Sequence, residues 1–135
     1  MSRQRNNAVI DTGSAGEYQA PEPYRRFMKV LIDQEAIPDA PLCLAEVRYP
    51  PGAKCPPHSH RESAEVYFVL EGELIATIDE HPHRVQSGQL AYIPSRTQHW
   101  AENQGIRDCL FVAIHAPPVD DILEVKHGWQ RTRVG

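Results

Sequence analysis

Residues 52–72 read GAKCPPHSHRESAEVYFVLEG, and the stretch HSHRESAE at positions 58–65 decides how this part of the chain folds. His58 and His60 are two residues apart, so on an extended strand both imidazoles point to the same face. Glu65 follows His60 by an odd number of residues and cannot share that face on one straight strand. A turn over the polar residues 61–64 is therefore predicted, with a second strand beginning at Glu65.

The strand that begins at Glu65 alternates in a way that indicates burial. Tyr67 and Val69 are expected on the same side as Glu65. The opposite face is also apolar and carries Val66, Phe68 and Leu70. Apolar residues on both faces are typical of a strand that is covered on both sides. Further short apolar runs, separated by glycine or proline, occupy residues 74–78, 90–93, 99–101 and 109–114. Short strands at hairpin spacing predict an all-β fold, an antiparallel double-sheet roll or barrel.

A second group of spaced residues lies further along the chain. With five, four and three residues between them, its members are Gly88, Pro94, His99 and Asn103. Together with the block 52–72, this group resembles the two sequence motifs of the cupin superfamily, and the chain resembles its small single-domain members. Arg96 is the one departure, because it stands where the family usually has glycine. With the flanking strands, the resemblance extends over most of residues 42–117.

The resemblance implies a single antiparallel cupin-type β-barrel, a double-sheet jelly roll with short N- and C-terminal extensions. It also implies one divalent metal ion per chain, held by three imidazoles and one carboxylate. The implied ligands are His58, His60, Glu65 and His99. Nitrogen and oxygen ligands without thiolate suit several metals. Iron is our first choice, and manganese, nickel, zinc, cobalt and copper remain open.

This donor set predicts a small-molecule metalloenzyme. Three neutral imidazoles and one carboxylate leave a divalent ion with a formal charge of about +1, which favours an anionic or enolisable substrate. We expect an iron-dependent oxygenase, of the dioxygenase type, that acts on a small oxygenated or anionic compound. A metal-dependent isomerase, lyase or decarboxylase that passes through an enolate is one alternative. A non-catalytic metal-dependent sugar or carboxylate sensor is another, because a fold does not fix a function.

Two residues outside the ligand set are candidates for substrate contact. Tyr67 is expected on the interior with Glu65, where its hydroxyl either orients substrate or bonds to backbone or water. Arg96 either lies in a relaxed type I turn with its side chain in solvent, or leans over the barrel mouth and clamps an anionic substrate. An arginine in the left-handed conformation costs roughly 1 kcal/mol relative to glycine. Arg48 shares the polar face of its strand with Glu46, and we expect that face in solvent.

The remaining histidines and cysteines have plainer interpretations. His81 and His83 are predicted to lie in a solvated hairpin turn, and His115 and His127 have no partner at ligand spacing. Cys55 is expected to be a small buried residue. The cysteines are three in number and lack paired metal spacing, which predicts reduced thiols in a cytoplasmic protein.

Length and composition fit one compact domain. The chain has 135 residues and a formal net charge of −4, and its lysines and arginines form no stripe, so nucleic-acid binding has little support. No apolar stretch reaches the length of a membrane span. We expect a flexible N-terminal arm over residues 1–23, the barrel over 24–116, and a C-terminal tail over 117–135 packed on the barrel or on a partner.

The apolar runs outside the predicted barrel motifs suggest a homodimer. A strand is expected within residues 25–33, and Phe27–Ile32 or the tail around Trp129 would otherwise form exposed apolar patches.

Overall fold

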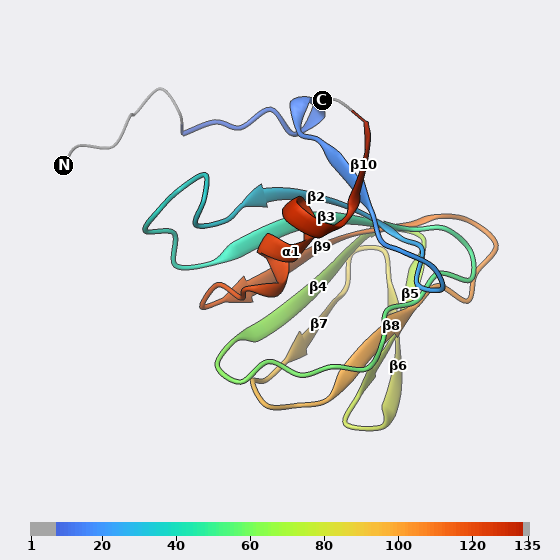
Figure 1. The fold of residues 1–135 in the computed structure, drawn as a ribbon. Helices are drawn as coiled ribbons and strands as arrows, with labels where there is room; N and C mark the ends of the chain where they lie inside the picture. The colour runs from blue at the N-terminus through green and yellow to red at the C-terminus, as the bar shows by residue number, and fades with distance from the viewer. Residues whose placement is uncertain (1–7, 134–135) are drawn as a thin grey trace.

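The computed structural model describes residues 8–133, and these residues are mostly β-structure (Figure 1). The elements in chain order are η2 (Thr12–Ser14), β1 (Glu17–Gln19), β2 (Phe27–Ile32), β3 (Cys43–Tyr49), β4 (Ala64–Glu71), β5 (Glu73–Ile78), β6 (His81–Gln86), β7 (Leu90–Ile93), β8 (His99–Glu102), β9 (Cys109–Ala116), α1 (Asp121–Gly128) and β10 (Gln130–Arg133).

The strands form two antiparallel sheets. One sheet has seven strands in the order β10-β1-β2-β3-β9-β4-β7, and the other has three in the order β6-β5-β8. The two layers lie against each other without closing into a continuous barrel (Figure 1). The predicted all-β double-sheet roll is therefore confirmed, as an open form of the barrel.

The core lies between the sheets because the strands alternate buried and less buried residues. In β3 every second residue from Cys43 to Tyr49 is buried, and β9 repeats this pattern beside it. On β4, Tyr67 and Val69 are buried as predicted. Most of the inner face thus consists of apolar side chains that lose contact with water on folding, and their burial is the main stabilising contribution.

The outer face of β4 differs from the prediction. Phe68 and Leu70 are 37% and 39% exposed, and Leu90 and Tyr92 on the neighbouring β7 are 58% and 60% exposed. The expectation that both faces of this strand are covered is therefore wrong for the described part of the single chain, because β4 and β7 lie at one end of the large sheet and none of residues 8–133 covers their outer face.

The backbone conformation of two turns explains which residues occupy them. Gly72 has a φ of +75°, and a Cβ there would lie 2.6 Å from the Asp108 carbonyl oxygen, so only glycine fits. The turn between β5 and β6 consists of Asp79 and Glu80, with φ angles of 50° and 67°. The hairpin is present, but His81 and His83 belong to strand β6 and not to its turn, which corrects their predicted position.

The two ends of the chain join the large sheet. The strand expected within residues 25–33 is confirmed as β2. Within the predicted arm, residues 17–19 form β1, which pairs with β2 and with β10, while residues 1–7 of that arm lie outside the described part. Helix α1 packs near β2, and β10 joins the large sheet beside β1 (Figure 1).

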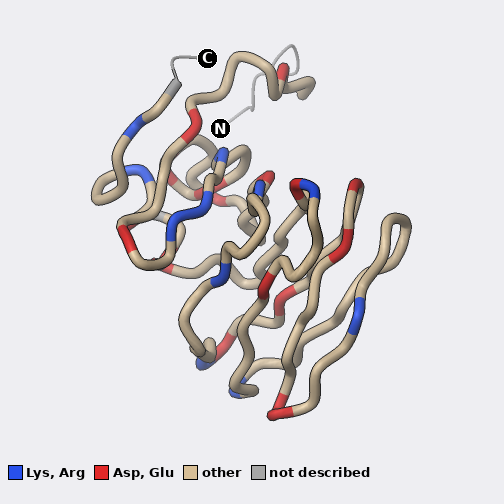
Figure 2. The backbone as a smooth tube through the Cα atoms, turned by 90° about the vertical axis from the view of Figure 1, so that its right-hand side faces the viewer, with Lys and Arg blue, Asp and Glu red and all other residues tan. Residues whose placement is uncertain are grey.

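Charged residues are interspersed along the fold. Lysines and arginines alternate with acidic residues over both layers, without a continuous basic stripe (Figure 2). Between residues 8 and 133, no helix has both the length and the apolar character needed to cross a membrane.

Candidate metal centre

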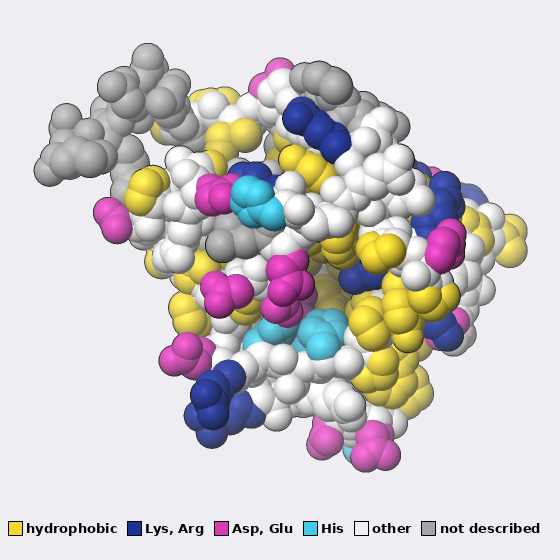
Figure 3. Space-filling model, in the orientation of Figure 1, with side chains coloured by type: hydrophobic (Ala, Val, Ile, Leu, Met, Phe, Trp, Pro, Cys, Tyr) yellow, Lys and Arg dark blue, Asp and Glu magenta, His cyan; other side chains and the backbone are white. Residues whose placement is uncertain are grey.

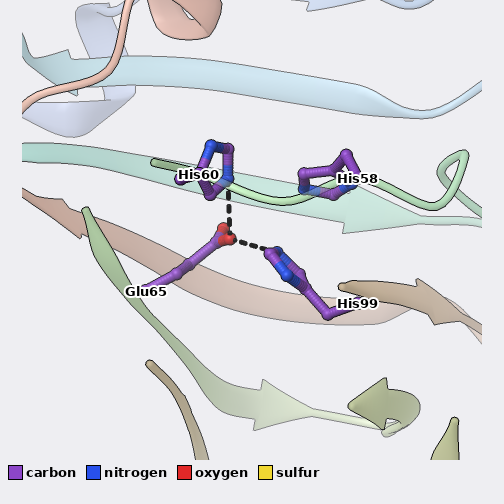
Figure 4. A group of neighbouring side chains, drawn as sticks. All are labelled: His58, His60, Glu65 and His99. Atoms are coloured by element: carbon purple, nitrogen blue, oxygen red, sulfur yellow. Dashed lines mark hydrogen bonds and ion pairs between the residues drawn. The ribbon is translucent and has the colours of Figure 1, made fainter. Parts of the chain in front are cut away.

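Four side chains from three separate segments point toward one another (Figure 4). His58 forms a backbone bridge with His99 at the start of β8, with N–O distances of 3.0 and 2.8 Å in the two directions. After His60 the chain bends at residues 61–62, as predicted, and Glu65 is the second residue of β4. The pairing of strands distant in sequence therefore brings the two spaced motifs into one cluster that could bind one metal ion.

The spacing of the donor atoms suits a divalent ion. The ligand atoms of His58, His60, Glu65 and His99 all lie within 4.8 Å of one another. Glu65 Oε1 is 2.8 Å from His99 Nε2 and 3.3 Å from His60 Nε2. Two ligands on perpendicular bonds of about 2.1 Å are about 3 Å apart, so these separations match neighbouring positions on one ion.

The hydrogen bonds of the imidazoles also favour a cation here. His99 has Nδ1 2.8 Å from a backbone carbonyl and Nε2 2.8 Å from Glu65, yet a neutral imidazole carries only one N–H. His58 has Nδ1 2.8 Å from the carbonyl two residues before it, which leaves Nε2 with a lone pair in the neutral ring. His60 Nε2 is buried without a hydrogen-bond partner. Each of these features is satisfied by a cation among the Nε2 atoms.

Glu65 is held in its ionised form. Burial acts to raise the pKa of this carboxyl group, but the close contacts with His115, His60 and His99 outweigh burial and hold the pKa well below its ordinary value. A carboxylate that stays ionised inside the protein is suited to metal coordination.

His115 is a fifth member of the cluster that the sequence interpretation missed. Its Nε2 lies 2.9 Å from Glu65 Oε2, while the other carboxylate oxygen faces His60 and His99. The cause is strand register, because His115 is paired directly opposite Glu65 between β9 and β4. The signal was present in the sequence, since His115 continues the buried alternation of β9 that includes Phe111 and Ala113.

Cys55 is buried, as expected, and it affects the pKa of one candidate ligand, His58. Burial would lower the pKa of His58, but the hydrogen bond and charge of Cys55 outweigh burial and raise that pKa to about 9. The Cys55 sulfur also accepts from the Ala101 N–H at 3.3 Å. All three cysteines are buried and free. The cytoplasmic location inferred from them stays a prediction.

A cavity of about 270 Å³ opens beside the cluster. Figure 3 shows a hollow on this face with histidine side chains on its floor and acidic side chains at its rim. The wall is mainly apolar and includes Met28, Val47, Phe111, Ile122 and Val125, the last two from α1. Helix α1 therefore shields one side of the cavity from solvent.

The two predicted substrate-contact residues take different positions. Tyr67 lines the cavity, and burial raises its pKa well above the ordinary value, so its hydroxyl keeps the proton. Arg96 is exposed, is not part of the cavity wall, and donates from Nε to the Arg61 carbonyl at 3.2 Å. Its φ is 62°, so the turn has kept the left-handed conformation, and the alternative in which it relaxes to type I is wrong.

The other candidates lie away from the cluster. Arg48 is 3.2 Å from Glu17 and 3.7 Å from Asp108, and its guanidinium lies 4.1 Å from the Phe27 ring centroid, on the face expected to meet solvent. His127 pairs with Glu35 at the surface.

An antiparallel double-sheet roll with three imidazoles and one carboxylate on its inner face defines a β-roll protein with a candidate metal site. Residues 45–115, more than half of the chain, match the Cupin domain family, and the chain belongs to that family.

Several known proteins are similar to this chain. The uncharacterized protein MJ1618 of Methanocaldococcus jannaschii is 31% identical over 106 residues, which cover 76% of this chain and 85% of that protein. An oxalate-binding protein of Thermotoga maritima is 28% identical over 87 residues, covering 64% of this chain and 72% of that protein. The dimethylsulfoniopropionate lyase DddW of Ruegeria pomeroyi is 39% identical over 75 residues, or 55% of this chain and 47% of the lyase.

A solved structure shows the same fold. The crystal structure of a predicted oxalate decarboxylase from Thermotoga maritima superimposes with a TM-score of 0.74 and 22% identity, covering 81% of this chain and 98% of that one.

Proposed function

We propose that this protein is a metal-dependent enzyme that cleaves a small carboxylate, as a lyase or decarboxylase. The observation that carries the proposal is the cluster of His58, His60, Glu65 and His99, of which the first three line a cavity. Relatives named as an oxalate-binding protein and as a dimethylsulfoniopropionate lyase support a small carboxylate as the ligand.

The residues around the cluster support this chemistry. A bound divalent ion would supply Lewis-acid polarisation of a ligand oxygen. Tyr67 keeps its hydroxyl proton and lines the cavity, so it is placed to donate a hydrogen bond to a ligand oxygen. The apolar wall excludes water and strengthens such polar contacts.

An iron-dependent oxygenase is a second candidate. The specific support is the donor set, because three imidazoles and one carboxylate leave two positions of a six-coordinate ion for other ligands. These positions would have to face the cavity for substrate and dioxygen to meet there.

The experiment begins with the metal content of protein purified without added metal. We expect one divalent ion per chain in the wild type and none in the double variant His60→Ala/His99→Ala. Stoichiometric metal in that variant would refute the site. His81→Ala/His83→Ala is the matched control, because both of these histidines are exposed on β6 and it should keep its metal.

The metal-loaded protein is then incubated with small carboxylates under nitrogen and under air. Cleavage products under nitrogen support the lyase or decarboxylase, and turnover coupled to oxygen uptake supports the oxygenase instead. Binding without turnover in either atmosphere would refute both and leave the non-catalytic sensor.

A further inference from the structure

Arg26 is the one arginine or lysine among the described residues that line the cavity beside the metal centre. It directly precedes β2, and the alternation of that strand explains its direction. Arg26 and Met28 both line the cavity, whereas Arg25 lies against Phe27, with its guanidinium carbon 4.8 Å from the ring centroid. Of these two adjacent arginines, Arg26 therefore faces the cavity, and Arg25 lies outside it against Phe27.

The guanidinium of Arg26 has no acidic partner among residues 8–133. Its NH1 donates to the Tyr24 carbonyl at 2.9 Å, and its central carbon lies 4.8 Å from the centroid of the Trp129 ring. These contacts fix the side chain but do not neutralise it, and the residue is half-buried. A guanidinium has five N–H donors, so most of them remain for a ligand.

The positive charge also reaches the interior of the cavity. Burial raises the pKa of Tyr49 and of Tyr67 well above the ordinary value, and the charge of Arg26 acts in the opposite direction on both. Asp121 and Glu124 also line the cavity, and Asp121 Oδ2 lies 3.7 Å from His60 Nδ1. Both acidic residues are exposed on α1, where solvent weakens the effect of their charge.

We propose that Arg26 binds a second acidic group of the ligand, so that the site selects small dicarboxylates. This inference rests on the proposed function only in that one end of the ligand meets the metal centre. A guanidinium binds a carboxylate through two parallel hydrogen bonds, which gives it a strong preference for this group. The apolar wall, which includes Met28 and Val125, suits a short hydrocarbon spacer between the two acidic ends.

The cavity has room for a ligand with such a spacer, because its volume is about 270 Å³. Succinate, a four-carbon dicarboxylate, is a suitable probe. Butyrate has the same carbon chain with only one carboxylate, so the two compounds form a matched pair of probes.

The test measures succinate and butyrate binding to Mn²⁺-loaded protein by calorimetry. We expect wild-type protein to bind succinate at least about tenfold more tightly than butyrate, as one charge-assisted contact predicts. Arg26→Gln should remove this preference while keeping the metal content and butyrate binding, and Arg26→Lys should restore part of it. Arg25→Gln, which makes the same change of charge one residue away, should behave as wild type.

Equal affinity of the wild type for the two probes, including no measurable binding of either, would overturn the proposal. An equal loss of the preference in the Arg25 and Arg26 variants would overturn it too, because the effect would then be one of overall charge. If Arg26→Gln does not fold, the proposal is judged on the succinate preference of the wild type and on whether Arg26→Lys keeps part of that preference. This test measures binding and not turnover, so a protein without enzymatic activity could still show the succinate preference.

Discussion

The contact between His115 and Glu65 gives a quantitative prediction for metal affinity. His115 is 5% exposed, and its Nε2 lies 2.9 Å from Glu65 Oε2. Since the carboxylate only accepts, this nitrogen donates, and the contact fixes the rotation of the carboxylate so that Oε1 faces the other imidazoles. His115→Leu removes the donor and leaves a buried carboxylate oxygen without its partner.

The size of the effect follows from the kind of bond that is lost. A hydrogen bond to a charged group contributes about 1.5–3 kcal/mol, and each 1.4 kcal/mol is about tenfold in an equilibrium constant. We therefore expect the Kd for Zn²⁺ to rise by roughly 10- to 100-fold, the range typical for residues that orient metal ligands. Competition with a chromogenic chelator measures this Kd directly.

Two further variants make the result interpretable. His115→Gln keeps an N–H donor and should recover part of the affinity, whereas a purely space-filling role would make leucine and glutamine equivalent. His127→Leu removes an exposed histidine and should leave the Kd unchanged. A wild-type Kd in His115→Leu, with an unchanged melting temperature, would refute the reasoning.

The remaining predictions concern pH, backbone strain and assembly. Because the pKa of His58 is about 9 and the ring must lose its proton to bind metal, Zn²⁺ affinity should fall as the pH drops below 9, by about tenfold per unit. Chelator competition from pH 7 to 9.5 checks this, and Cys55→Ser should move the fall to lower pH; a flat profile would contradict it. Arg96→Gly should raise the free energy of unfolding by up to about 1 kcal/mol in urea titrations, because glycine tolerates the φ of 62°. It should also leave ligand affinity unchanged, since the side chain bonds to Arg61 outside the cavity, and a weakened affinity would revive the clamp hypothesis. The expected homodimer is checked by light scattering at micromolar concentration, and a monomeric wild type would end that expectation. If the open outer face of β4 and β7 forms the interface, Leu90→Asp should give a monomer.

The sequence by itself predicted what depends on short separations along the chain. The shared direction of His58 and His60 and the turn before Glu65 were expected from strand periodicity, although the structure has only an isolated bridge at His58 and no strand over these two residues. The alternation through Tyr67 follows from the same periodicity, and the paired motifs added His99 by resemblance to a family. The covered outer face of β4 needed more than local information, and it was wrong for the described residues. One of the two alternatives for Arg96, the relaxed type I turn, was wrong as well.

Only the tertiary structure decided which distant residues share the site. His115 meets Glu65 because β9 pairs with β4 in one register, fifty positions apart in sequence, and a shift by one residue would turn it to the outer face. Arg26 and Trp129 come together at the cavity from opposite ends of the chain, as β10 pairs with β1 and α1 packs near β2. Local periodicity fixes the face that a side chain takes, but the register between strands and the docking of α1 are set by burial summed over the whole core, which no short stretch of sequence contains.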